Sequence, residues 1–92
     1  MTALYRIADG QAEAMEFVVA PTTQYLGIPL KDLRSRLRKG VLIAVIVRDG
    51  KVIIPEGSTT LERGDNVIVV ARNSGIFDLT DIYDSGVLSA GG

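Results

Sequence analysis

The chain of 92 residues contains no cysteine and no histidine. Without cysteine it has no disulfides, no thiolate metal sites and no cysteine nucleophile. Without histidine it lacks the commonest general base and metal ligand, so acid–base catalysis would have to rest on carboxylates, lysine or tyrosine. These absences argue against an enzyme and against a metal centre.

Long apolar runs are also missing. No run approaches the roughly 20 residues of a membrane-spanning helix. The opening residues, MTALYRIADG, have neither the basic nor the apolar region of a signal peptide. We therefore expect a cytoplasmic location without direct membrane insertion.

Features that favour nucleic-acid binding are scarce as well. The formal net charge is −1 and aromatic residues make up 5% of the chain. No aromatic side chain is interleaved with the main basic segment, although single-strand binders usually need such stacking platforms. We expect no nucleic-acid partner.

The most informative stretch is VLIAVIVRDGKVIIP, residues 41–55. Asp49-Gly50 joins its two apolar runs, and such a pair is favoured in the type I′ turn of a β-hairpin, where both central residues need positive φ. The seven residues Val41–Val47 are all apolar and do not alternate with polar ones. This pattern predicts a core strand covered on both faces.

The remaining elements follow from apolar periodicity and turn residues. We expect further strands at Leu4–Ile7, Glu13–Val19 and Asn66–Ala71, and short helices from Pro29 to about Arg38 and from Ile76 to Tyr83. The order β-β-α-β-β-β-α predicts an α+β fold class. We expect a two-layer domain in which a small mixed, mostly antiparallel sheet of about four to five strands carries one or two short helices. This domain should cover residues 3–84, with a disordered tail at 85–92.

Basic side chains gather around the first predicted helix. Five of the ten lysines and arginines lie there: Lys31, Arg34, Arg36, Arg38 and Lys39. Arginines on one helix face can make charge-assisted, often bidentate hydrogen bonds to phosphate or carboxylate. The structural alternative is that they solubilise a surface helix or pair with Asp78, Asp81 and Asp84, within the chain or across a dimer.

Other charged residues give weaker indications of a binding or catalytic site. Arg48 ends the core strand, where its charge can reach solvent or a neighbouring subunit, and an exposed strand end is the simpler interpretation. Glu56, Glu62 and Asp65 lie in turn sequences that favour carboxylates for local hydrogen bonding, and no nucleophile or base accompanies them. The glycines are too far apart for a dinucleotide-binding fingerprint. We expect neither a catalytic site nor a bound cofactor in this chain.

Four short motifs together resemble the C-terminal domain of regulators of potassium conductance, the RCK-C or TrkA-C module. They are E-F-x-V at 16–19, G-x-P-L-K-D-L at 27–33, I-x-R-D-G-K-x-I-I-P at 46–55 and L-E-x-G-D-x-V-I-V at 61–69. The closing segment FDLTDIYD also resembles the end of a Trk-type regulator subunit. In that family the module usually follows a Rossmann-like nucleotide-binding domain.

The resemblance implies a cytoplasmic regulatory domain of a potassium-uptake system, not an enzyme. Such a domain forms a homodimer and, through the full-length protein, couples a small anionic effector to a membrane transporter subunit. Some members bind cyclic di-AMP between two C-terminal domains, and the corresponding residues here are Arg34, Arg36, Arg38, Gly40 and Val41. Gly40 stands where that pattern tends to have Asn, and Pro29 where it is usually aliphatic. The alternative is a purely structural oligomerisation module without a ligand of its own.

Overall fold

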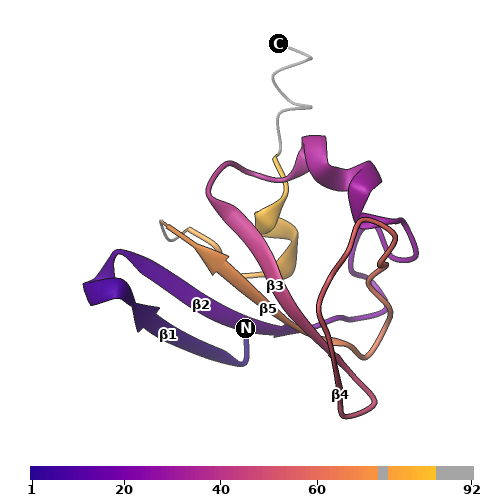
Figure 1. Ribbon diagram of the computed structural model, residues 1–92, viewed down its shortest axis with the longest axis horizontal. Coiled ribbons are helices and arrows are strands. Elements are labelled where there is room, and N and C mark those ends of the chain that lie inside the picture. The colour runs from indigo at the N-terminus through magenta and orange to yellow at the C-terminus, as the bar shows by residue number, and fades with distance from the viewer. Residues whose placement is uncertain (73–74, 85–92) are drawn as a thin grey trace.

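The computed structural model describes residues 1–72 and 75–84, so the tail expected at 85–92 lies outside the described residues. One sheet holds five strands in the order β1-β2-β5-β3-β4, shown in Figure 1. The strands are β1 Ala3–Ile7, β2 Ala12–Val18, β3 Val41–Arg48, β4 Lys51–Ile53 and β5 Asn66–Ala71. Two short 3₁₀ helices lie between strands, η1 Ala8–Gly10 and η2 Leu30–Arg36, and a third, η3 Leu79–Ile82, follows β5. The α+β fold class is confirmed, and all four strand pairings described are antiparallel.

The predicted hairpin is present between β3 and β4. Asp49 has a φ of 53° and Gly50 a φ of 77°, the positive values that a type I′ turn requires. The turn pairs Arg48 with Lys51 and Ile46 with Ile53. β4 is only three residues long, so it covers only the end of β3.

The core lies between the sheet and the two later helices. β5 occupies the centre of the sheet, and its side chains alternate so that Val67, Val69 and Ala71 are buried. Its pairing with β2 places Met15 and Phe17 on the same face. Buried residues of the helices complete this core, namely Leu33 of η2 and Leu79 and Ile82 of η3.

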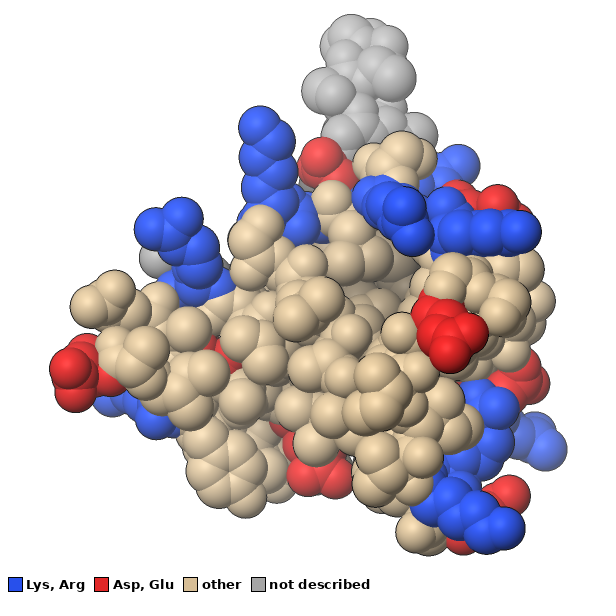
Figure 2. Space-filling view, viewed as in Figure 1, with Lys and Arg blue, Asp and Glu red and all other residues tan. Residues whose placement is uncertain are grey.

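The opposite face of the sheet is largely apolar, with Glu16 and Asn66 as polar members, and no described element covers it. The strand register forms one row across it from Tyr5 to Leu42 and a second from Val18 to Val52. These four residues, called here the open face, are between 51% and 66% exposed. Figure 2 shows a broad uncharged area on the face that it views, with lysines and arginines towards its rim.

The prediction that Val41–Val47 is covered on both faces is therefore wrong for the single chain. Ile43 and Ile46 are buried, but Leu42, which lies on the open face, is 60% exposed. The apolar run indicates that neither face of the strand carries polar side chains over Val41–Val47. It does not indicate whether this chain itself covers both faces.

Both predicted helices are shorter than expected and of the 3₁₀ type. η2 ends at Arg36 because Leu37 is extended and forms a β-bridge with Tyr83, while the Arg38 N–H donates to the Ile82 carbonyl at 2.9 Å. η3 begins only at Leu79, after a capping box formed by Asp78 and Asp81. None of the helices in the described ranges is long and apolar enough to cross a membrane.

Candidate functional site

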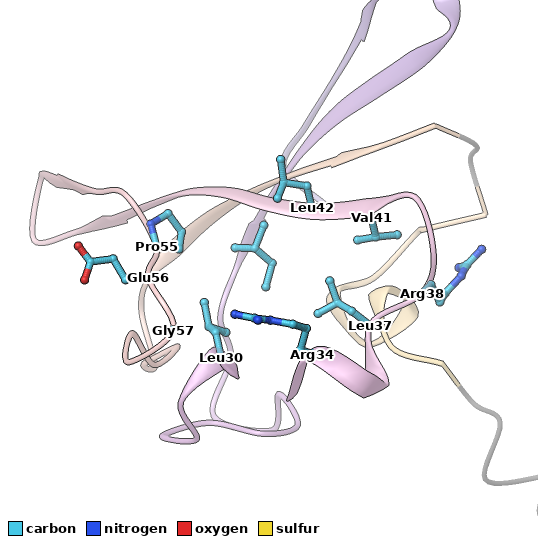
Figure 3. Close-up of a pocket in the computed structure, with 10 residues that line it drawn as sticks. Leu30, Arg34, Leu37, Arg38, Val41, Leu42, Pro55, Glu56 and Gly57 are labelled. Atoms are coloured by element: carbon cyan, nitrogen blue, oxygen red, sulfur yellow. The ribbon is translucent and has the colours of Figure 1, made fainter. Parts of the chain in front are cut away.

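A cavity of about 390 Å³ lies between η2, the first half of β3 and residues 55–57, shown in Figure 3. We call it the η2 cavity. Its lining residues are Leu30, Arg34, Leu37, Arg38, Val41, Leu42, Ile43, Pro55, Glu56 and Gly57. Small-molecule sites typically enclose roughly 300–1,000 Å³, mostly apolar with a few polar groups, and this cavity fits that description.

The cavity exists because the edge of β3 is only partly covered. β5 pairs along β3 from Val41 to Val47, but β4 pairs only with Ile46 to Arg48. Beside the uncovered stretch stands η2 in place of a strand. The wall is fixed by backbone hydrogen bonds from Leu30 N–H to the Thr59 carbonyl at 2.8 Å and from Lys31 N–H to the Gly57 carbonyl at 2.9 Å.

The charge of the cavity comes from Arg34. Figure 3 shows its side chain extending from η2 across the cavity towards Leu30, whereas the carboxylate of Glu56 points away. Among the described residues, the ion pairs are Arg6–Glu13 and Arg48–Asp65, so no carboxylate pairs with Arg34. An exposed guanidinium beside an apolar cavity, without a carboxylate partner among the described residues, suits an anionic group that brings flat apolar surface with it.

Three of the five expected site residues meet at this cavity: Arg34, Arg38 and Val41. Arg38 lines its far end and is also anchored, because its Nη1 donates to the carbonyl oxygen of Asp81 at 2.9 Å. This contact is with the backbone, and no described aspartate side chain pairs with the arginines of the 34–38 segment. The Asp81 carboxylate instead accepts the N–H groups of Phe77 and Asp78.

The other two expected residues lie elsewhere. The Arg36 guanidinium lies over the ring of Tyr25, 5.5 Å from its centroid, which is a cation–π contact. Tyr25 in turn packs edge-on against Tyr83, with ring centroids 4.8 Å apart. Gly40 lines a second, smaller cavity on the other side of the turn that precedes β3.

Sequence reasoning missed two features, one at this cavity and one at the other end of β3. Leu42 lines the η2 cavity and also belongs to the open face, which a run of uninterrupted apolar residues cannot reveal. Asp65 is buried and bound by Arg48, whereas the turn sequence around it suggested only local hydrogen bonding. The sequence signal for the burial of Asp65 is weak, since an acidic residue before a strand is common in turns.

Comparison with known proteins gives a consistent picture. A family model described as the TrkA-C domain matches residues 14–83. The Trk system potassium uptake protein TrkA homolog of Archaeoglobus fulgidus is 35% identical over 77 residues, which are 84% of this chain and 17% of that protein. The TrkA homolog of Pyrococcus abyssi is 32% identical over 73 residues, which are 79% of this chain and 32% of that protein.

More distant similarities agree with these. Trk system potassium uptake protein trkA homolog 1 of Methanosarcina mazei is 26% identical over 80 residues, so the chain spans only 19% of its length. A solved chain described as "Structure of RCK domain with cda" superposes with a TM-score of 0.54 at 24% identity, covering 67% of this chain and 81% of that one. At this identity the superposition shows a shared fold.

Proposed function

The chain belongs to the TrkA-C domain family, and from this premise we propose that it is a regulatory, non-catalytic domain of a potassium-uptake system. It acts on the cytoplasmic side, forms a homodimer, and couples a small anionic ligand to a membrane transporter through the full-length protein. The named relatives support the potassium assignment, because they are Trk system potassium uptake proteins.

The observation that carries the ligand proposal is Arg34 in the η2 cavity. Arg34 is an exposed residue that pairs with no described carboxylate, and its side chain lies beside the leucine, valine and proline side chains that line the cavity. A cyclic dinucleotide matches this lining, since its phosphates suit the arginine and its bases offer apolar faces. The solved RCK chain with the same fold is described with cda, which supports the same class of ligand.

Leu42 connects the ligand to the dimer. Its side chain lines the η2 cavity and is 60% exposed on the open face. A second copy packed on that face would bury Leu42 and stand at the mouth of the cavity. A ligand held between the two copies would favour one relative orientation only by binding that orientation more tightly.

A thermal-shift screen with cyclic di-AMP, other cyclic dinucleotides, ATP, ADP and simple anions tests this proposal. A ligand at 100 times its Kd stabilises the folded state by about 2.7 kcal/mol. For a domain of this size, each kcal/mol raises Tm by about 4–8 °C. We expect such a rise with a cyclic dinucleotide, its reduction in Arg34→Gln, and its retention in Lys31→Gln, which changes an exposed cation of η2 outside the cavity.

The second candidate is a structural oligomerisation module without a ligand. Two arginine contacts favour it, since Arg36 stacks on Tyr25 and Arg38 binds the Asp81 carbonyl. Under this alternative no compound in the screen raises Tm, and Arg34→Gln, Arg36→Gln and Arg38→Gln together leave potassium uptake by the full-length protein unchanged.

A further inference from the structure

A second cavity of about 220 Å³ lies where β3 and β5 meet, on the other side of the turn that precedes β3. It is lined by Arg38, Lys39, Gly40, Val41, Ala71 and Arg72, and we call it the Arg72 cavity. Arg38 and Val41 line the η2 cavity as well, while Lys39 and Arg72 do not.

The strand register assembles this cavity from residues far apart in the chain. Val41 pairs with Ala71, and the Arg72 N–H donates to the Gly40 carbonyl at 3.2 Å. Arg72 is thereby fixed opposite the turn that carries Arg38 and Lys39. Gly40 has a φ of +79°, a backbone conformation that glycine adopts without strain.

Three basic residues, Arg38, Lys39 and Arg72, thus line one cavity. The ion pairs described within residues 1–72 and 75–84 involve none of the three. The sequence at 73–74 and 85–92 contains no aspartate or glutamate. Asp81 contacts Arg38 only through its carbonyl oxygen, and its carboxylate is engaged by two backbone N–H groups. Like charges held together repel one another, and a bound anion would relieve that repulsion.

We propose that the Arg72 cavity binds a phosphate group, at a site separate from the η2 cavity. Its volume lies below the roughly 300–1,000 Å³ of pockets that enclose whole drug-sized ligands, so it suits a single anionic group. Arginine supplies a planar fork of donors and lysine a compact charge, the two donor types that bind phosphate oxygens. The two cavities are adjacent and share Arg38 and Val41, but Arg34 lines only the η2 cavity.

The test is a titration of the ¹⁵N-labelled chain with inorganic phosphate and with pyrophosphate, followed by NMR amide shifts. We expect saturable shifts at Gly40, Val41 and Ala71. In the double variant Lys39→Gln/Arg72→Gln, the affinity should fall at least about tenfold, since two charge-assisted contacts are lost. The matched control Lys51→Gln/Arg63→Gln removes two exposed cations elsewhere and should bind like the parent chain.

A second arm distinguishes a soluble phosphate from a lipid headgroup. Co-sedimentation is measured with phosphatidylglycerol vesicles and with neutral phosphatidylcholine vesicles, for the parent chain and both double variants. If binding requires Lys39 and Arg72 in the phosphate titration or in the vesicle measurement, the site is supported. The measurement that shows the binding identifies whether the phosphate group comes from a soluble ion or from a lipid headgroup. The proposal is overturned if no saturable shift and no vesicle binding occur, or if the control variant loses as much as the cavity variant. Arg34→Gln should leave phosphate binding intact, so failure here and failure of the cyclic dinucleotide proposal are separate results.

Discussion

Arg48 and Asp65 form a bidentate ion pair that joins the end of β3 to the turn before β5. Arg48 Nε lies 2.8 Å from Oδ1 of Asp65, and Nη2 lies 2.8 Å from Oδ2. The Asp65 side chain is 1% exposed and that of Arg48 33%. Arg48 also donates to the Thr60 carbonyl, and Asp65 accepts the Glu62 N–H. The pair therefore holds the 60–65 loop against the sheet.

Breaking this pair should destabilise the fold. Asp65→Asn and Arg48→Met each leave a buried or half-buried group without its charged partner. Such losses cost about 3–5 kcal/mol in fully buried pairs, and we expect about 1–3 kcal/mol here because Arg48 is partly solvated. Urea denaturation measures the change. Arg6→Met is the matched control, since the Arg6–Glu13 pair spans 3.8 Å with Arg6 74% exposed and should contribute little. Equal losses of the free energy of unfolding in the Arg48–Asp65 variants and in Arg6→Met would contradict this expectation.

The same carboxylate makes the fold sensitive to acid. Burial alone would raise the pKa of Asp65, but the hydrogen bonds from Arg48 and from the Glu62 backbone outweigh it and hold the pKa below its ordinary value. The folded state therefore binds this proton less tightly than the unfolded state does. The stabilisation is complete above about pH 4 and is lost as pH falls through the lowered pKa. We expect urea midpoints of the parent chain to fall in that range and those of Asp65→Asn to fall less; parallel curves would argue against it.

Tyr83 should make the fold sensitive to alkali. Its side chain is buried, and its hydroxyl has no hydrogen-bond partner among the described residues. Burial, with a smaller contribution from Tyr25, raises the pKa of Tyr83 from 10.0 to about 12. Stability from this group is therefore present below pH 10 and is lost as pH rises towards 12.

Tyr83→Phe keeps the ring that packs on Tyr25 and removes the hydroxyl. We expect an unchanged or slightly higher free energy of unfolding at pH 7, by up to about 1 kcal/mol, and a smaller loss above pH 10. Marked destabilisation of Tyr83→Phe at neutral pH would show that its hydroxyl is satisfied.

The open face should carry the dimer contact. Val52 is 66% exposed there and does not line the η2 cavity, so Val52→Lys tests the contact without touching the ligand site. We expect the parent chain to sediment as a dimer and this variant as a monomer, because burying an unpaired lysine is costly. Phe77→Ser is the control, since Phe77 is 74% exposed but lies before η3, outside the sheet. A parent chain that stays monomeric at high concentration would remove the dimer proposal.

Local rules predicted most of the fold. The hairpin follows from two residues, Asp49 and Gly50, whose positive φ is a local property. The strands follow from composition and turn residues. Coverage of the sheet is not local: an apolar strand such as β3 reads the same whether its second face meets a helix of its own chain or lies open.

Three of the five residues expected at the ligand site lie at one cavity, and the other two lie elsewhere. Arg34, Arg38 and Val41 line the η2 cavity, but Arg36 points to Tyr25. Residues two apart point to different sides in a 3₁₀ helix and in an α-helix alike, so Arg36 does not share the side of Arg34. The position of Arg72 beside Gly40 could not be predicted from the sequence either, because it depends on the long-range pairing of β3 with β5.

We propose that the η2 cavity binds an anionic ligand through Arg34 in a dimer, and calorimetric titration of cyclic di-AMP into the parent chain, Arg34→Gln and Lys31→Gln tests this proposal. We expect saturable binding with one ligand per two chains. The affinity should be at least about tenfold weaker in Arg34→Gln because a charge-assisted contact is lost, and unchanged in Lys31→Gln. No binding by the parent chain, or equal binding by Arg34→Gln, would contradict it.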